Sequence, residues 1–355
     1  MADVKISIEE LNDPRIDDLV NLEKAMQKKT SSEYVEDVPT PFIFNPIFYY
    51  SVATTLGSFV MWFFVEPLYA NNSGLNNLPF VSDYLVFGPV ASAIGLSIGL
   101  VYGWSNRNLK QAAICGAIGL GVGAVATIIT TFIASIVFNI FIQIAAGAIK
   151  NNPVAGEYPI RGLGFFILLC GRGVAWAIVA IGSGIGLGVA LKSKKLLLNG
   201  LVGGMIGGAL GGMLFDPIER LLYESFDDAS ISRAVGCIAV GLLVGIFVGI
   251  FENISKDSWL LMVKGPLAGK QFNIYKNPMV IGSAPSCDIY LFKDSAIDPR
   301  HATIKKSGNK YLLNLELRTK VLLVNGRQVD SHVLQPDDVI TIGKTVLKYQ
   351  EKKKN

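Results

Sequence analysis

Residues 196–215 read LLLNGLVGGMIGGALGGMLF, an apolar run without a charged residue. A helix that crosses a lipid bilayer needs about 20 largely apolar residues. Glycines recur in this run at every fourth position, and that spacing places them on one face of a helix. A face without side chains lets two helix backbones approach closely, which favours helix association in lipid. The run therefore predicts a tightly packed transmembrane helix.

Five further segments have the same apolar character, so the sequence predicts a polytopic bundle within residues 46–252. The six expected spans are 47–66, 85–104, 112–146, 163–191, 196–215 and 232–251. Composition agrees, because 17% of the residues are charged against about a quarter in soluble domains. The candidate helix-packing glycines are Gly95, Gly99, Gly103, Gly200, Gly204, Gly208, Gly212, Gly241, Gly245 and Gly249. Packing within one bundle, self-association and a glycine-lined pore all remain open for them.

The loops between the spans predict the orientation. Arg107, Lys110 and the lysines of 192–195 fall in two short loops on one side, whereas residues 216–230 on the other side are acidic. Short basic loops face the cytoplasm. We therefore expect a multi-pass protein of the plasma (inner) membrane with both termini in the cytoplasm and the lipid bilayer as its surroundings.

Charged residues within the spans are few. Arg172 and Arg233 occupy matching positions in two similar stretches of sequence. Ile94–Leu100 likewise resembles Ile181–Leu187, so the sequence predicts a repeated helical hairpin. We expect both arginines, and Glu66 at the end of the first span, to lie at the non-cytoplasmic interface; a charged gate is the alternative. The spans lack a ladder of acids and histidines, which argues against an ion-coupled carrier.

Residues 1–45 are polar and predict a cytoplasmic segment. A helix start at Asn12-Asp13-Pro14 and an imperfect apolar stripe up to Lys29 indicate a short amphipathic helix. A proline-containing linker follows. The helix has three candidate docking places, namely the membrane surface, the soluble domain or a partner.

The sequence changes character at residue 257. Short alternating runs separated by Gly, Pro and Asn turns predict an all-β sandwich over 257–350, followed by a basic tail, 351–355. Walker, kinase and Gly-x-Ser-x-Gly signatures are lacking, so we expect no enzyme activity. The four cysteines and two histidines have no metal-ligand spacing, and a net charge of +4 does not indicate nucleic acid. We therefore expect no metal, cofactor or nucleic-acid partner.

A series of motifs in this region identifies a family. It comprises Gly265…Gly269-Lys, Val280-Ile-Gly-Ser…Cys287-Asp-Ile-Tyr-Leu, Asp298-Pro-Arg-His-Ala-Thr-Ile, Val324-Asn-Gly and Leu334-Gln-Pro-Asp-Asp-Val-Ile-Thr-Ile-Gly. In order and spacing it resembles a forkhead-associated (FHA) domain over about 259–350. The glycine-rich hairpins resemble those of bacterial FHA-containing membrane proteins. The resemblance implies an 11-stranded sandwich whose loops bind phosphothreonine peptides.

The phosphate-binding positions depart from the family pattern. The resemblance places Arg where this chain has Ser283, and Ser where it has Asp298. A carboxylate at the second position repels a phosphate dianion. The candidate peptide-binding residues are Ser283, Asp298, Arg300, Arg318, Lys320 and Asn325, and the resemblance gives Gly282, His301 and Gly326 a loop-structural role. Arg300, Arg318 and Lys320 form an alternative cationic site.

The interpretation we favour is a membrane-anchored scaffold. Its cytoplasmic FHA-like domain docks a protein partner without phosphothreonine, and its bundle packs with other membrane subunits or with itself. One alternative is a small channel or transporter regulated by the FHA-like domain. Another is a phosphothreonine receptor in Ser/Thr kinase signalling.

Overall fold

The computed structural model describes residues 38–71, 79–150, 162–223, 229–308, 310–316 and 320–352. They form a helical unit over Pro41–Lys256 and a β unit that begins at Asp257. The amphipathic helix expected near the N-terminus lies outside the described residues, and so do residues 353–355 of the basic tail.

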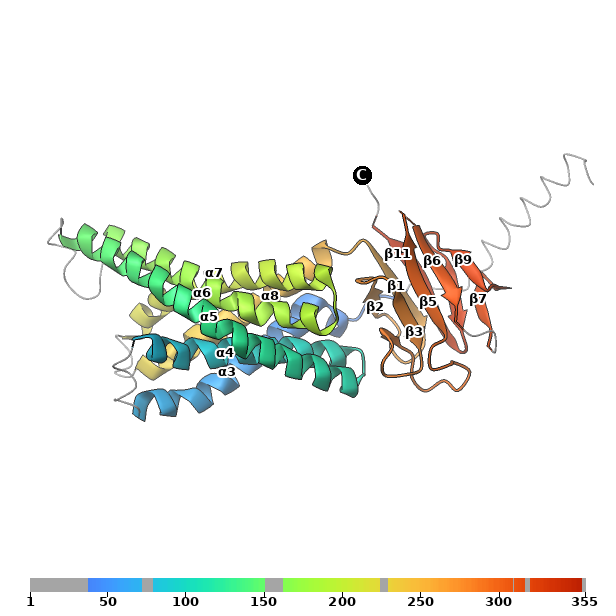
Figure 1. The fold of residues 1–355 in the computed structure, drawn as a ribbon, viewed down its shortest axis with the longest axis horizontal. Coiled ribbons are helices and arrows are strands. Elements are labelled where there is room, and N and C mark those ends of the chain that lie inside the picture. The colour runs from blue at the N-terminus through green and yellow to red at the C-terminus, as the bar shows by residue number, and fades with distance from the viewer. Residues whose placement is uncertain are drawn as a thin grey trace, which may run out of the picture. The chain divides into compact units, whose positions relative to one another are not determined.

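The helical unit begins with a short 3-10 turn, η1 (Phe42–Phe44), and continues with long helices (Figure 1). These are α3 (Pro46–Asn71), α4 (Pro79–Ser105), α5 (Leu109–Lys150), α6 (Gly162–Ala190), α7 (Lys194–Tyr223) and α8 (Ala229–Ile254). Within the described residues, six helices are long and apolar enough to cross a membrane. Each contains one of the expected spans, except that 163–191 runs one residue past the end of α6.

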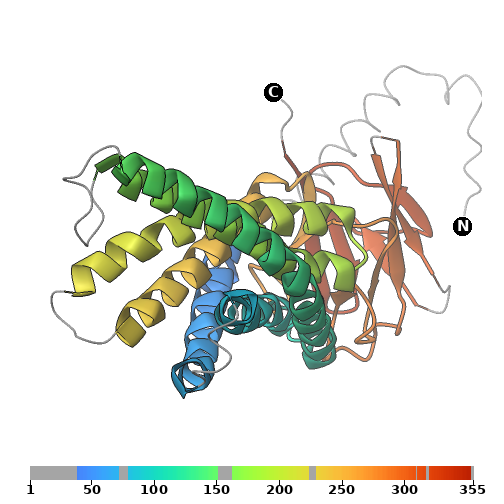
Figure 2. The same ribbon diagram turned by 60° about the vertical axis from the view of Figure 1, so that its left-hand side comes forward.

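Each of these helices packs against the next along the chain, and α8 returns to pack along α3. The bundle therefore closes on itself. Figure 2 shows the long α5 running diagonally across it. Glycine faces allow the close approach at the closing seam: a Cβ on Gly245 would lie 2.6 Å from Cα of Ser51, and one on Gly249 would lie 2.5 Å from Cα of Ile47.

The turns after α4 and α6 share one geometry. Arg107 and Lys192 have left-handed φ angles of 53° and 51°. A single left-handed residue ends a helix and leaves its last carbonyls accessible to the following amides. The next residue then caps the new helix: Asn108 Oδ1 accepts from the amide of Gln111 at 3.0 Å, and Ser193 Oγ from that of Leu196 at 3.3 Å.

These turns also set which residues of the two hairpins correspond. Because Arg107 matches Lys192, Ile94 corresponds to Val179. The sequence pairing of Ile94 with Ile181 differs from this alignment of the turns by two residues and stays a prediction. Glycine spacing of four looks similar at several registers, so it did not determine the alignment.

The β unit contains two sheets. The strands are β1 (Ser258–Lys264), β2 (Gln271–Asn273), β3 (Met279–Gly282), β4 (Ile289–Tyr290), β5 (Ala302–Ser307), β6 (Lys310–Leu315), β7 (Leu322–Val324), β8 (Arg327–Gln328), β9 (Ser331–Val333), β10 (Val339–Ile342) and β11 (Thr345–Glu351). One sheet has the order β2-β1-β11-β10-β7-β8 and the other β4-β3-β5-β6-β9. The β3–β4 pair is parallel.

The core of the β unit follows from strand alternation. In β11, Thr345, Leu347 and Tyr349 are buried while the residues between them are not, as expected when successive side chains point to opposite faces. Tyr349 pairs with Leu260 of β1, and both are fully buried. The predicted fold class, a membrane-type helical bundle followed by an all-β FHA-like sandwich, is confirmed.

Candidate functional site

The loops that the family resemblance singled out join strands β3–β4, β4–β5 and β6–β7. Gly282 ends β3, and a Cβ there would collide with the carbonyl of Pro299. Because Gly282 has no side chain, the β3–β4 loop can lie directly against the β4–β5 loop. The amide of Ser283 donates to Asp298 O at 2.9 Å, and the amide of Ala284 donates to Pro299 O at 3.1 Å. The first two loops therefore form one hydrogen-bonded surface.

Ser283 uses its side chain within this surface. Its hydroxyl donates to the carbonyl oxygen of Ile297 at 2.9 Å, and the residue is half-buried. Asp298 follows Ile297 directly, so an acid lies on the loop to which Ser283 is bonded. Ser283 thus holds two loops together in the structure.

His301 lies beneath the same loop and is fully buried. Its Nδ1 accepts a hydrogen bond from the amide of Asp298 at 3.3 Å, which places the ring proton on Nε2. Burial lowers the pKa of His301 below its usual value, because a charged imidazolium is poorly solvated there. A neutral histidine therefore supports the backbone at Asp298.

The candidate cationic residues Arg300 and Lys320 interact with different groups of the domain. Arg300 is exposed, and its Nε lies 3.4 Å from the carboxylate of Glu316 in the β6–β7 loop. Lys320 is half-buried, and its charge contributes to lowering the pKa of His301. Arg318 lies outside the described residues. A basic cluster of all three therefore stays a prediction.

Asn325 and Gly326 form the tight turn between β7 and β8, with φ angles of 51° and 78°. Such angles are typical of a type I′ hairpin turn. The Asn325 amide group donates to Asp338 Oδ1 at 2.8 Å and accepts from the amide of Val339 at 2.9 Å. Asn325, a candidate peptide-binding residue, therefore uses its side chain for hydrogen bonds within the domain.

Asp338 is a buried hub that the sequence reasoning missed. Besides Asn325, it accepts from the amide of Gln335 at 2.7 Å, and one of its oxygens lies 2.9 Å from His332 Nε2. His332 is half-buried against this carboxylate. The signal was the acid pair after Pro336, which the resemblance included without assigning it a role.

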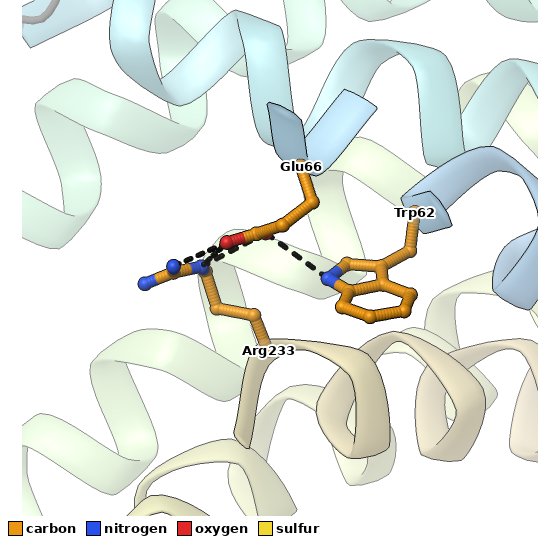
Figure 3. Close-up of polar contacts among 3 residues, drawn as sticks. All are labelled: Trp62, Glu66 and Arg233. Carbon is orange, nitrogen blue, oxygen red and sulfur yellow. Dashed lines mark hydrogen bonds and ion pairs between the residues drawn. The ribbon is translucent and has the colours of Figure 1, made fainter. Parts of the chain in front are cut away.

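A second group of polar contacts lies in the membrane-type bundle. Arg233 of α8 and Glu66 of α3 form an ion pair in which Nε lies 3.1 Å from both carboxylate oxygens (Figure 3). Trp62, one turn earlier on α3, donates its indole N–H to the same carboxylate at 3.0 Å. Glu66 and Arg233 were each expected at an interface, but nothing in the sequence paired them.

Arg172 of α6 is paired too. Its Nε lies 2.8 Å from Asp216 of α7, and its guanidinium carbon lies 5.0 Å and 5.6 Å from the ring centroids of Phe138 and Phe215. Such stacking on aromatic rings stabilises a cation. Both arginines therefore join neighbouring helices. Among the described residues, no group of three or more His, Cys, Asp or Glu is placed to hold a metal.

Comparisons with known proteins bear on the β unit. Residues 261–353 match the family described as "Inner membrane component of T3SS, cytoplasmic domain". This match and the two-sheet topology agree with the motif series. The C-terminal domain is of the FHA type. The match does not include the helical unit.

The FHA-type domain also has similar relatives. An oxoglutarate dehydrogenase inhibitor of Corynebacterium jeikeium is 34% identical over 94 residues, which are 26% of this chain and 65% of that protein. The chain thus spans less than two thirds of that relative's length.

Two solved structures have a similar domain. One is the FHA domain of a Chlamydia trachomatis protein, with 22% identity, 28% of this chain covered, 100% of that chain and a TM-score of 0.26. The other is the cytoplasmic domain of the T3SS sorting platform protein PscD from P. aeruginosa, with 17% identity, 28% and 83% coverage and a TM-score of 0.25.

Proposed function

We propose that the protein is a non-enzymatic membrane scaffold whose cytoplasmic FHA-type domain docks a protein partner without requiring phosphothreonine. The observation that carries the proposal is the bond from the Ser283 hydroxyl to Ile297 O. In the family pattern this position holds an arginine that reaches the peptide. Here a shorter, neutral side chain is bonded to the next loop instead.

The charge at Asp298 supports the same conclusion. A phosphothreonine carries a charge of about −1.5 to −2 at neutral pH. The carboxylate of Asp298 would lie where the family pattern has a serine that donates to phosphate. Arg300 is already paired with Glu316, so its charge is partly compensated.

The surface formed by these loops suits an unphosphorylated partner. Pro299 and Arg300 are exposed, and Pro285 and Ser286 of the neighbouring loop are exposed as well. These residues rest on a framework held by Gly282 and His301. A rigid, mixed polar surface of this kind fits a folded protein or an extended peptide that contacts loop backbone.

The bundle has more helices than an anchor needs, so we infer that it also packs with other membrane subunits or with itself. The family description, an inner membrane component with a cytoplasmic domain, supports a multi-pass inner-membrane protein. By the positive-inside rule, the basic turns at Arg107 and Lys192 support our inference that both ends of the bundle's chain face the cytoplasm.

We also infer that the bundle is an internal repeat of three helix pairs. Gly99 meets Cys115 across α4 and α5, and Gly184 meets Gly200 across α6 and α7. Gly245 meets Ser51 in the same way across α8 and α3, so the third pair joins the last helix to the first. A glycine contact near the cytoplasmic end of each pair gives all three the same packing.

The test is affinity purification of the full-length tagged protein from its native membrane, with and without phosphatase treatment of the lysate. We expect the same protein partners in both preparations, identified by mass spectrometry. A partner that is present only without phosphatase would overturn the phosphate-independent mode. Recovery of no partner in either preparation would overturn the scaffold itself.

A further inference from the structure

A groove lies at the end of the FHA-type domain where β1 begins and β11 ends. Its volume is about 960 Å³, which is in the range of ligand-binding pockets in proteins, about 300–1,000 Å³. Lys306 lines the groove and follows His301 by five residues, most of them in β5. Five residues of an extended strand span about 17 Å. The groove is therefore separate from the loops around Ser283.

The groove has aromatic walls and lysines on its rim. Trp259 of β1 is half-buried, and its indole N–H donates to Gln350 Oε1 of β11 at 2.7 Å, which fixes the ring. On the other sheet, Nζ of Lys306 lies 5.8 Å from the ring centroid of Tyr311. Lys352 lines the groove at the end of β11 and is followed in sequence by two further lysines. This lining suits a ligand that has both an aromatic group and negative charge.

Two of the three described acids that line the groove are bonded within the domain. The carboxylate of Asp337 lies 3.3 Å from Nζ of Lys348, and the carboxylate of Glu351 accepts a hydrogen bond from the hydroxyl of Tyr349. These contacts compensate the acids locally. The lysines on the rim therefore make the groove attractive to an acidic ligand.

The N-terminal part of the chain meets the domain beside this groove. Thr40 groups with the β unit, and its Oγ1 accepts a hydrogen bond at 3.3 Å from Nε2 of Gln271 on the edge strand β2. In the register of β1 with β2, Trp259 lies two positions along β1 from the partner of Gln271. The Cα atoms of Trp259 and Gln271 are therefore about 10 Å apart or less. Residues shortly before Thr40 can reach the groove.

The sequence before Thr40 has the composition that the groove favours. Residues 33–37 read EYVED, and residues 30–40 contain no Lys or Arg. Asp37 can lie up to about 11 Å from Thr40, and Glu33 up to about 25 Å. The amphipathic stretch 12–29 is further away, and its four acids are balanced by four Lys or Arg. Residues 33–37 are therefore the better match in both reach and charge.

We propose that the acidic residues 33–37 dock in this groove of their own FHA-type domain, with Tyr34 against the aromatic walls and the acids at Lys306 and Lys352. The groove is then a second binding site of the domain, with specificity for an acidic, aromatic peptide. An outside ligand of the same chemistry must displace the chain's own segment. The proposal is independent of how the loops around Ser283 bind a partner.

The short connection to Thr40 makes weak docking sufficient. A flexible tether of a few residues gives an effective concentration in the millimolar range, so a segment with a Kd of about 0.1 mM would occupy the groove about nine-tenths of the time. The same competition predicts that a free peptide of this sequence binds the intact protein about tenfold more weakly than a protein whose own segment is displaced.

The first test is carbodiimide cross-linking of the full-length wild-type protein, which joins a lysine to an acid only where the two are in contact. We expect peptide mass spectrometry to find Lys306 or Lys352 joined to an acid of residues 33–37. The bond between Lys348 and Asp337 is the internal control, because the structure already pairs them. Recovery of the control bond alone would overturn the proposal. With a mixture of ordinary and ¹⁵N-labelled protein, bonds only between copies would place the segment on a second copy and would also overturn it.

The second test measures competition in solution. A fluorescent peptide of residues 30–40 is titrated into the full-length protein, either wild type or the triple variant Glu33→Gln, Glu36→Gln and Asp37→Asn. We expect the triple variant, whose own segment no longer competes, to bind the peptide about tenfold more tightly than wild type. Equal affinity of the two proteins would mean that the segment occupies the membrane surface or a partner instead, and would overturn the proposal.

Two further variants make this test specific. The matched control, Glu9→Gln with Glu10→Gln and Asp13→Asn, removes the same charge elsewhere and should bind the peptide as wild type does. Lys306→Glu and Lys352→Glu, added to the triple variant, should abolish binding, and a peptide whose three acids are changed to lysine should restore it. Binding that is unaffected by these two lysines would place the peptide elsewhere and would reject the groove.

Discussion

Gly184 of α6 and Gly200 of α7 face one another so closely that the carbonyl oxygen of each occupies the space of a Cβ on the other. Gly200→Ala must therefore separate the two backbones. We expect it to lower the free energy of unfolding by about 1–3 kcal/mol, the usual cost of overpacking, measured as thermal unfolding in detergent. The control is Gly121→Ala on α5, where no atom lies within 4 Å of the added group. Equal losses in the two variants would contradict close packing at Gly200.

The Glu66–Arg233 pair should stabilise the contact of α3 with α8. Removing one partner of a buried pair costs roughly 3–5 kcal/mol. The Arg233 side chain is 26% exposed, so for Glu66→Gln we expect a smaller loss of about 2 kcal/mol. A double-mutant cycle with Arg233→Gln measures the coupling directly. Additive losses would mean that the pair contributes nothing to stability.

Asp338 should be important for the stability of the FHA-type domain. Asp338→Ala leaves the amides of Asn325 and Gln335 and the ring of His332 without their acceptor. We expect a loss of about 2–4 kcal/mol from these unpaired groups, measured by chemical denaturation. The neighbouring Asp337→Asn is the control, because its side chain is 64% exposed, its pair with Lys348 is worth little, and Asn tolerates the left-handed φ of 71° at this position. Similar losses of stability at both positions would mean that the hydrogen bonds to Asp338 do not stabilise the domain.

The stability of this domain should fall in mild acid because of His301. Burial lowers its pKa in the folded state, so the unfolded chain binds the proton more readily. Stability is then complete above the unfolded pKa of about 6.5 and decreases as pH falls toward the folded value. Wild type should lose stability between pH 7 and 5, and His301→Gln should lose less over that range. Asp294, whose pKa is lowered chiefly by the backbone amide of Lys344, adds a loss only below about pH 4.

Two substitutions should convert the loops to phosphothreonine recognition if the departures from the family pattern are the cause of its loss. Ser283→Arg supplies the missing cation, and Asp298→Ser removes the acid. A charged hydrogen bond is worth about 1.5–3 kcal/mol, so the double variant should prefer phosphorylated over unphosphorylated threonine peptides by at least tenfold. Fluorescence anisotropy with a peptide library measures this preference. A wild-type protein that already prefers phosphothreonine would refute the proposed docking mode.

The general fold could be predicted because its signals are local. Apolar runs of bilayer length indicated the helices, and the motif series that includes His301 and Gly326 indicated an FHA-type domain before any contact was known. The resemblance also gave Gly282 a structural role in its loop, and in the structure an added Cβ at this position would collide with the carbonyl of Pro299.

The pairing of distant residues could not be predicted in this way. Glu66 and Arg233 are far apart in the chain, and either charge alone is equally compatible with an interfacial anchor. Asn325 showed the same limit. Its place in a tight turn was clear, but whether its amide pointed to a peptide or to Asp338 depended on strands that meet only in three dimensions. The sequence alone does not determine the register of the two hairpins for a related reason, because glycines at a spacing of four look alike at several registers.

The closure of α8 onto α3 has a consequence for how the protein is made. During synthesis, Glu66 emerges from the ribosome with α3, while its counter-ion lies 167 residues further along the chain. The insertion machinery must therefore accommodate a helix with an uncompensated acid until the last span arrives. The pair forms only when α8 has been made, and a chain truncated before α8 would leave Glu66 without its counter-ion.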